Sequence, residues 1–160
     1  MARPISQIGY FVIHHSAADL DVAGLKHEYA MRGEGYNFVI DDETASQTDR
    51  KYDAVELLPP TVVSNGVYGL NWSAWNICVD GNYDVQPIAQ NSDKVHALIQ
   101  TIAAKAKAWG WRKRHVAYII THQYAGLYLS AQRYGTACPG RNLIAHLPYI
   151  RQKVARYLPA

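Results

Sequence analysis

The amino-acid sequence predicts an α/β fold in which a central β-sheet is covered by helices. Strand-like apolar runs alternate with helix-like stretches along the chain, and this order places helices against a sheet. The 160 residues are 49% hydrophobic and only 18% charged, which provides enough apolar surface for one buried core. The sequence contains no internal repeat, low-complexity tract or linker-like composition. We therefore expect residues 1–160 to form a single domain.

The first part of the chain predicts a strand, a helix and a second strand. Residues 10–14 (YFVIH) are apolar on both faces until the histidine, which is typical of a buried central strand that ends at a surface. A helix should follow, capped by Asp19 or Asp21 and ended by Gly33. Its repeating apolar positions are Val22, Leu25 and Tyr29. The run 36–40 (YNFVI) predicts the second strand.

The middle of the chain alternates between loop-like and apolar sequence. Residues 41–72 are polar and are punctuated by turn-forming residues, so we expect irregular loops of the kind that line functional sites. Residues 75–79 (WNICV) predict a strand, which the turn at residues 80–82 (DGN) ends.

The remainder of the chain predicts a long helix, a strand and a terminal helix. Ser92 caps the helix and Gly110 ends it. Its apolar stripe consists of Val95, Leu98, Ile99, Ile102, Ala106 and Trp109. Residues 116–121 predict a strand that leads directly to a histidine. The final helix covers residues 143–158 and restarts at Pro148.

The composition excludes several classes of function. No apolar run reaches the ~20 residues of a membrane-spanning helix, and the N-terminal residues lack the features of a secretory signal. We therefore expect synthesis in the cytoplasm and no membrane insertion. The net charge of +3 suits an anionic polymer, but Lys and Arg are not massed as in proteins that bind nucleic acid. Cys78 and Cys138 cannot build a disulfide framework, so each is a core residue, a ligand or a nucleophile.

Two predicted strands end in histidine, and a cysteine follows in a turn. A catalytic zinc site uses about four tetrahedral positions, of which protein nitrogen, sulfur or oxygen atoms fill three. His14, His122 and Cys138 could supply these three. Taken singly, a histidine at a strand end is more often a satisfied polar residue, and a lone cysteine is usually a small buried hydrophobe. Cys138 lies in the turn at residues 136–140 rather than in an apolar periodic segment, which favours a ligand.

Five short motifs follow one another from residue 11 to the terminal helix. They are VIHHSA at residues 12–17, GYNFVI at 35–40, Asn71 with WNICVDG at 75–81, ITH at 120–122 and TACPG at 136–140. Together they resemble the zinc-dependent N-acetylmuramoyl-L-alanine amidases of type 2, a group that includes small phage lysozyme-type amidases and the peptidoglycan recognition proteins. The resemblance implies a central mixed β-sheet covered by helices. It also implies a Zn²⁺ ion held by His14, His122 and Cys138.

The resemblance implies roles for further residues. Tyr36 corresponds to the family's catalytic tyrosine; its unperturbed pKa of about 10 makes it a poor general base, so it would orient the water or donate to the oxyanion. Thr136 could donate a hydroxyl to the same developing charge, or bond to local backbone as an ordinary turn residue. Asn71 and Trp72 are predicted to bind substrate, and Trp75 flanks the same loop, where a glycan or stem peptide could stack.

Three features depart from the family pattern. The spacing from His122 to Cys138 is longer than in the short phage enzymes, so residues 124–134 resemble an insertion that shapes substrate access. Some members carry a lysine two residues before the cysteine, where this chain has Thr136. A cation near the developing charge is therefore missing. Gly66 stands where a histidine often precedes the family's asparagine.

The resemblance implies zinc-dependent hydrolysis of the amide bond between N-acetylmuramic acid and L-alanine in peptidoglycan. Lacking a signal sequence and a separate cell-wall-binding domain, the chain fits a phage-type endolysin, expected to be a monomer that reaches the wall once the membrane is breached. Two alternatives stay open. A peptidoglycan-binding domain without hydrolysis is disfavoured because Cys138 completes the ligand set. A metal-free cysteine hydrolase would use Cys138 with His122, and metal content distinguishes it from the zinc enzyme.

Overall fold

One mixed β-sheet forms the centre of the computed structural model, which describes residues 2–17, 24, 35–41 and 53–160. Its strands are β1 (Tyr10–His15), β2 (Phe38–Asp41), β3 (Asp53–Glu56), β4 (Ala74–Val79) and β5 (Ile119–Thr121). The strand order is β3-β2-β4-β1-β5. β1 pairs in parallel with β4 and β5, β2 pairs in parallel with β4, and β3 is antiparallel to β2. The predicted mixed sheet is confirmed, and β1 has a parallel neighbour on each side.

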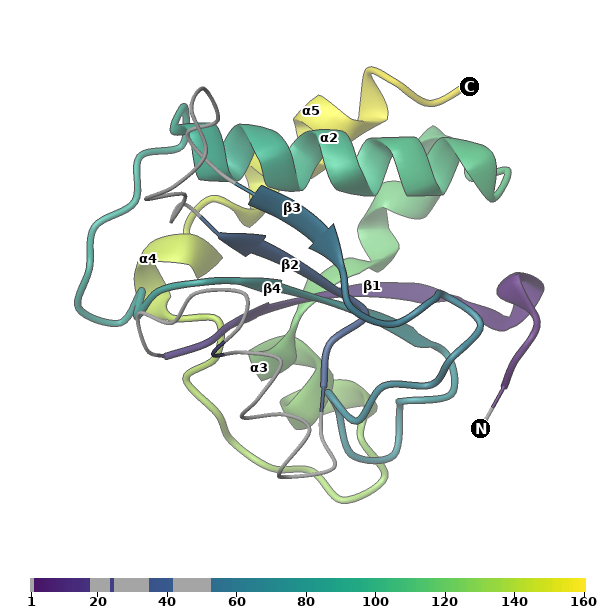
Figure 1. The fold of residues 1–160 in the computed structure, drawn as a ribbon, viewed down its shortest axis with the longest axis horizontal. Helices are drawn as coiled ribbons and strands as arrows, with labels where there is room; N and C mark the ends of the chain where they lie inside the picture. Colours follow the sequence, from purple (N-terminus) through teal and green to yellow (C-terminus); the bar gives the residue numbers. More distant parts are fainter. Residues whose placement is uncertain (1, 18–23, 25–34, 42–52) are drawn as a thin grey trace.

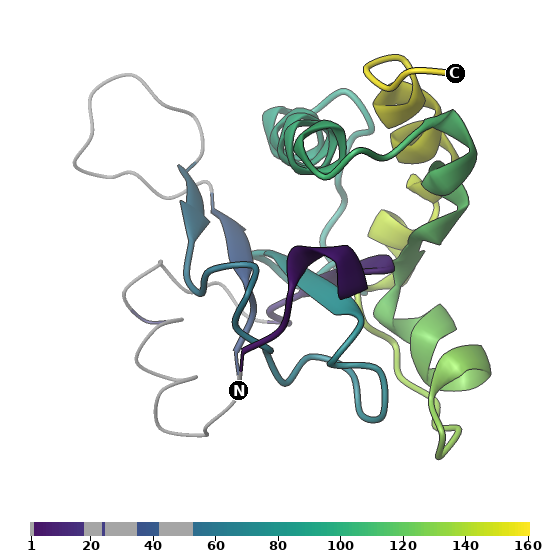
Figure 2. The ribbon, with the colours of Figure 1, turned by 90° about the vertical axis from the view of Figure 1, so that its right-hand side faces the viewer.

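Helices cover both faces of this sheet. The helical segments of the described chain are η1 (Ile5–Gln7), α2 (Asp93–Ala108), η2 (Lys113–Tyr118), α3 (His122–Tyr124), η3 (Ala125–Leu129), α4 (Arg141–Ile144) and α5 (Leu147–Ala155). α2 and α5 pack together on one side of the sheet, whereas α3 lies on the other side (Figure 1). The perpendicular view in Figure 2 separates the same two layers, with α2 and α5 above the strands and the green segment of α3 and η3 below them.

The two faces of the sheet carry different sets of buried side chains. Because side chains alternate along a strand, Phe11 and Ile13 of β1 face the layer of α2 and α5, whereas Val12 packs on the opposite face with Ala125. The first face holds the main core, which includes Trp75, Ile77, Leu98, Ile102, Ile150 and Val154. His14 shares the smaller face with Val12, so it points away from this main core.

Helix α2 begins and ends as the sequence predicts, whereas the terminal helix predicted over residues 143–158 is divided into α4 and α5, and α5 ends at Ala155. The Ser92 hydroxyl caps α2 by accepting a hydrogen bond from the Val95 backbone N–H (3.3 Å). The predicted stripe of α2 is buried except for Trp109, which follows the helix and is partly buried, and Gly110 comes next with a φ of +74°. Pro148 lies in the first turn of α5, where a missing backbone N–H costs no helical hydrogen bond.

The prediction of a strand at residues 116–121 is wrong over its first half. Lys113–Tyr118 forms the 3₁₀ helix η2, and only Ile119–Thr121 pairs with β1. The turn is stabilised locally, because the Arg112 backbone N–H donates to Nδ1 of His115 (2.8 Å). The apolar run from which the strand was predicted gives no sign of this contact between a side chain and the backbone.

The prediction of irregular loops at residues 41–72 is wrong at Asp53–Glu56, which forms strand β3. β3 pairs with β2, and Val55 lies opposite Val39. Apart from Gly24, the helix predicted from Asp19 or Asp21 to Gly33 lies outside the described residues. None of the helices in the described ranges combines the length and the apolar character needed to cross a bilayer.

Candidate metal centre

Neighbouring parallel strands bring two histidines together. His14 belongs to β1, and His122 is the first residue after β5. Ile13 lies opposite Thr121 in the ladder, so the next residue of each strand is also adjacent. The two imidazole rings have centroids 4.6 Å apart. The register of two strands therefore builds the histidine pair that the sequence predicts.

Cys138 joins this pair from the turn before α4. Its Sγ lies 3.8 Å from Nδ1 of His14 and accepts a hydrogen bond from the His15 backbone N–H (3.4 Å). The Thr136 hydroxyl oxygen accepts from the Cys138 backbone N–H (3.2 Å), which stabilises the turn. One potential ligand atom from each of His14, His122 and Cys138 lies within 4.8 Å of the other two. The structure thus brings together all three residues predicted as metal ligands.

A buried polar network orients His14. Its Nε2 lies 2.8 Å from Oδ1 of Asn76 on the adjacent strand β4. The Asn76 amide then donates to the Ser64 hydroxyl (2.8 Å), and Ser64 donates to Oδ1 of Asn37 (2.8 Å). All four side chains are buried. Because Asn76 Oδ1 can only accept, Nε2 of His14 carries the proton and Nδ1 is the ring nitrogen that faces Cys138.

His122 is oriented by a tyrosine from the segment that precedes Cys138. The Tyr134 hydroxyl lies 2.9 Å from Nε2 of His122. Burial raises the pKa of the Tyr134 phenol, so this hydroxyl keeps its proton at neutral pH. Nδ1 is then the nitrogen of His122 that remains for a metal ion.

Burial keeps all three candidate ligands uncharged in the absence of a cation. Desolvation, reinforced by His122, lowers the pKa of His14 well below 6.5, although its hydrogen bond to Asn76 opposes the shift. Burial also lowers the pKa of His122 to about 4, with a smaller contribution from His15. Desolvation raises the pKa of the Cys138 thiol to about 12. Two neutral imidazoles are ready to coordinate, and a divalent cation would favour the thiolate of Cys138.

This donor set fits a zinc ion. Zn²⁺ prefers imidazole nitrogen and thiolate sulfur, and its catalytic sites use three protein ligands with one position left for water. His14, His122 and Cys138 supply two nitrogens and one sulfur. In each histidine Nε2 has a hydrogen-bond partner and Nδ1 remains for the metal ion, which is the usual arrangement for metal-binding imidazoles.

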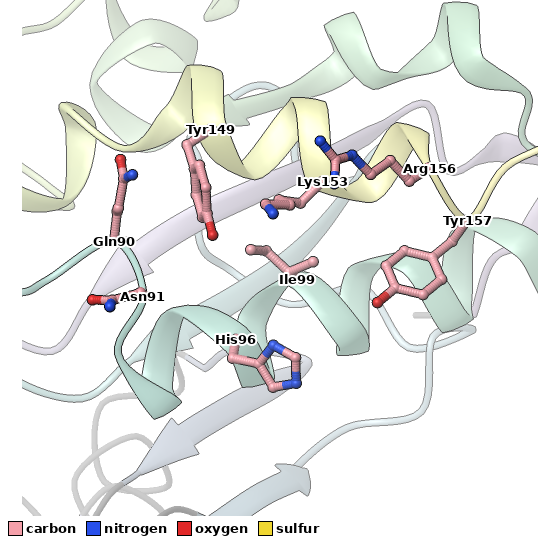
Figure 3. A pocket seen from close by; sticks show the side chains of 8 residues that line it. All are labelled: Gln90, Asn91, His96, Ile99, Tyr149, Lys153, Arg156 and Tyr157. Carbon is pink, nitrogen blue, oxygen red and sulfur yellow. The ribbon is translucent and has the colours of Figure 1, made fainter.

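The two histidines line a cavity of about 250 Å³. The other residues around it are Gly35, Tyr36, Asn65, Gly66 and Tyr134. A larger cavity of about 430 Å³ lies on the opposite side of the sheet between α2 and α5 (Figure 3). His96 is the one residue of its lining that commonly binds metal ions, and neither a cysteine nor a carboxylate belongs to that lining. The chemistry of the lining residues therefore favours the smaller cavity as the functional site.

Sequence comparison assigns the chain to a family. A family model described as N-acetylmuramoyl-L-alanine amidase matches residues 4–141, which include His14, His122 and Cys138. The chain belongs to the N-acetylmuramoyl-L-alanine amidase family. No curated protein sequence matches it significantly.

Solved structures share the fold of this amidase-family chain. The Ph2119 endolysin from Thermus scotoductus MAT2119 bacteriophage Ph2119 has a TM-score of 0.66 at 20% identity, over 92% of this chain and 88% of the endolysin. N-acetylmuramoyl-L-alanine amidase LysC from Clostridium intestinale URNW has a TM-score of 0.69 at 18% identity, over 96% and 91%. Drosophila peptidoglycan recognition protein SD has a TM-score of 0.61 at 18% identity, over 86% and 78%. At these identities the likeness establishes the fold.

The two residues predicted to act in amidase catalysis occupy different positions. Tyr36 lines the cavity, and its ring centroid lies 4.9 Å from that of His14. Its side chain hydrogen-bonds with Cys78, which is buried on β4. Thr136 is outside the cavity lining and binds the backbone of Cys138, as an ordinary turn residue does. The structure thus brings Tyr36 to the ligands, and the catalytic roles of Tyr36 and Thr136 stay predictions.

The residues predicted to bind the amidase substrate are not part of the cavity lining. The Asn71 side chain accepts a hydrogen bond from a backbone N–H of its own loop (2.6 Å). Trp72 is 42% exposed and donates a hydrogen bond to Gln7. The expectation that Trp75 could stack on substrate is wrong, because strand alternation turns its side chain into the main core, where it packs edge-to-face on Phe11.

Four polar residues of the site were not predicted from the amidase-family motifs: Asn37, Ser64, Asn76 and Tyr134. Asn76 and Asn37 offered a signal, because each interrupts an apolar strand sequence, WNICV and YNFVI. A buried amide needs hydrogen-bond partners, so a polar residue within a buried strand indicates an internal network. Tyr134 offered no comparable signal among the 12 tyrosines of the chain.

Proposed function

We propose that this chain is a zinc-dependent N-acetylmuramoyl-L-alanine amidase. The bond that it hydrolyses joins the lactyl group of N-acetylmuramic acid to the L-alanine of the stem peptide in peptidoglycan. One observation carries the proposal: the cluster of His14, His122 and Cys138 beside a cavity, in a chain of the amidase family. The similarity to an endolysin and to the amidase LysC supports the same reaction.

The residues of the site suit amide hydrolysis, which builds negative charge on the carbonyl oxygen. His14, His122 and Cys138 would hold the zinc ion, which would supply Lewis-acid chemistry toward this carbonyl and a water molecule. Tyr36 would orient the water or donate its phenol proton to the oxyanion. The Tyr36 hydroxyl would then give up its hydrogen bond with the Cys78 side chain, which is a weak partner, and form one with the substrate or the water.

The metal-free cysteine hydrolase is disfavoured by the environment of Cys138. A nucleophilic cysteine needs a lowered pKa, which an adjacent imidazolium or another positive charge provides. Here burial raises the pKa of the thiol to about 12 and keeps the neighbouring His14 neutral. The thiol is therefore a poor nucleophile but a suitable ligand for a cation.

The biological setting forms part of the proposal. We place the chain among phage-type endolysins that act as monomers on the bacterial wall after the membrane is breached, and its likeness to the Ph2119 endolysin supports this setting. Peptidoglycan recognition proteins share the fold as well, so binding without hydrolysis is the competing function. The complete set of three candidate ligands favours hydrolysis.

Digestion of purified peptidoglycan tests the reaction. We expect new alanine amino termini to appear in step with turbidity loss, without new reducing ends, and one zinc per chain in the purified protein. His14→Ala, His122→Ala and Cys138→Ala should each lose zinc and activity together. Cys78→Ala is the matched control for zinc content alone, because this second cysteine lies outside the ligand cluster but hydrogen-bonds with Tyr36; its variant should retain zinc.

Each competing function predicts a different result. New reducing sugars would identify a glycosidase, which normally uses a pair of carboxylates. Amino groups from deeper in the stem peptide would identify a peptidase. Wall binding with no release would support recognition alone. Full activity in a strong chelator, without bound metal, would identify the thiol hydrolase.

A further inference from the structure

The segment between His122 and Cys138 places the side chain of Tyr134 beside His122, one of the candidate metal ligands. After α3 the chain forms the π-helix η3, and Tyr134 then approaches His122 across the segment. The phenol oxygen lies 2.9 Å from Nε2 of His122, and the two rings meet edge-to-face at 5.8 Å. The longer spacing from His122 to Cys138 therefore provides a hydrogen-bond partner for one of the ligands.

Tyr134 is held by its own segment and by the facing loop. Its backbone N–H donates to the Gly126 carbonyl (3.1 Å). A Cβ at position 126 would lie 2.8 Å from the Tyr134 carbonyl oxygen and 2.9 Å from its ring, so only glycine permits this approach. The Ser130 hydroxyl donates to the Tyr68 carbonyl (2.8 Å) and fastens the segment to the facing loop. The backbone contacts and the glycine at position 126 thus hold the Tyr134 ring against its own segment.

The hydrogen bond to Tyr134 fixes the direction of the His122 ring and accommodates its metal-binding form. A neutral imidazole carries one proton, and the nitrogen without it is the one that binds a metal ion. When Nδ1 faces the metal, Nε2 carries the proton and donates it to the Tyr134 oxygen. Tyr68 provides a further backbone hydrogen bond to the same phenol. Without Tyr134, the ring would lose this contact at Nε2 and could rotate, which would move Nδ1 out of the ligand position.

We propose that Tyr134 is a positioning residue that holds His122 with Nδ1 directed at the metal, through the hydrogen bond between its phenol oxygen and Nε2 of His122. The inference rests on the proposed zinc-dependent function. It assigns the chain's longer segment at residues 124–134 a role in metal retention, and it makes Tyr134 the counterpart of Asn76, which holds His14.

Zinc affinity tests this role directly. The parent chain, Tyr134→Phe, Gly126→Ala and Tyr128→Phe should be titrated with Zn²⁺ in competition with a chelating dye. Loss of a hydrogen-bond partner to a metal-binding histidine typically weakens metal affinity by about 10- to 100-fold, and we expect this loss for Tyr134→Phe. Gly126→Ala keeps the hydroxyl but displaces the ring, so its affinity should fall as well. Tyr128→Phe alters an exposed tyrosine of the same segment and should match the parent.

A kinetic measurement distinguishes positioning from direct catalysis. With zinc at saturating concentration, kcat of Tyr134→Phe for alanine release should return toward that of the parent. Equal zinc affinity of the parent and Tyr134→Phe would overturn the inference and leave the amidase proposal standing. A fall in kcat at saturating zinc, with unchanged affinity, would also overturn it by assigning Tyr134 to the substrate. If Tyr134→Phe does not fold, the affinity of Gly126→Ala decides the question. A parent chain that binds no zinc would refute the proposed function, and the inference with it.

Discussion

Replacing Asn76 by alanine should weaken both the fold and the metal site. The side chain is fully buried and joins two others: it accepts from Nε2 of His14 and donates to the Ser64 hydroxyl. Asn76→Ala leaves the His14 N–H without its acceptor in the protein interior, which costs about 1–3 kcal/mol. Loss of the bond to Ser64 adds about 1 kcal/mol. We therefore expect the free energy of unfolding to fall by about 3 kcal/mol, which a domain of ordinary stability survives.

Urea unfolding followed by tryptophan fluorescence measures this loss. Asn142→Ala is the matched control, because its amide also donates a hydrogen bond, to the Gln86 carbonyl (2.7 Å), but does so at the exposed surface. The control should lose much less stability, with the same dependence on urea concentration. Equal losses in the two variants would refute the reasoning, because they would show that burial of the network adds nothing.

The variant Asn76→Asp separates orientation of His14 from stability. It keeps an oxygen that accepts from Nε2, but it places a carboxylate in the interior, where an unpaired charge is costly. Carboxylates often hold metal-binding histidines in this way. We expect zinc affinity close to that of the parent for Asn76→Asp and about 10- to 100-fold lower for Asn76→Ala. Equal zinc affinity in the two variants would show that the network does not orient His14.

Three further predictions concern the cavity and the pH dependence. Tyr36→Phe should retain the fold and zinc but lose about 10²-fold or more in kcat, the typical cost of one lost donor; an unchanged rate of alanine release would make Tyr36 structural. Gly66→Ala should weaken zinc binding, because its Cβ would lie 2.4 Å from Cγ of Asn76 and displace the acceptor of His14; zinc titration checks it, and an unchanged affinity contradicts it. Stability of the zinc-free protein should fall as pH drops from about 6.5 toward 4, because burial holds the pKa of His122 near 4 while the unfolded chain takes up the proton at about 6.5. Urea midpoints at pH 7.5 and pH 5 measure this effect, and a higher midpoint at pH 5 would reverse the sign of the argument.

The clustering of the three candidate ligands was predictable because local sequence placed each one at the end of a strand or in a turn. The apolar run before His14 and the short run before His122 each predict a strand, and parallel strands of one sheet end at the same edge. Cys138 lies in a turn, where an apolar role is uncommon. The fold class followed from the same alternation of strands and helices.

The supporting network was not predictable, because its members are close only in the folded chain. His14 and Asn76 are 62 residues apart, and Asn76 and Ser64 meet only because the intervening loop folds back on β4. Tyr134 depends on a π-helical turn and on the glycine contact at position 126, and neither leaves a period in the sequence. Long-range side-chain hydrogen bonds have no local pattern from which they could be predicted.

The placement of the three candidate ligands along the chain sets the earliest point in biosynthesis at which they could hold a metal ion together. His14 and Cys138 are separated by 124 residues, and His14 meets His122 only after β1 has paired with β5. In a zinc finger the ligands are close in sequence and the ion drives folding. Here a long loop must close before two ligands meet. A nascent chain on the ribosome therefore holds only one of the three candidate ligands until β5 has emerged, and under the proposed function the ion would bind after the sheet has formed.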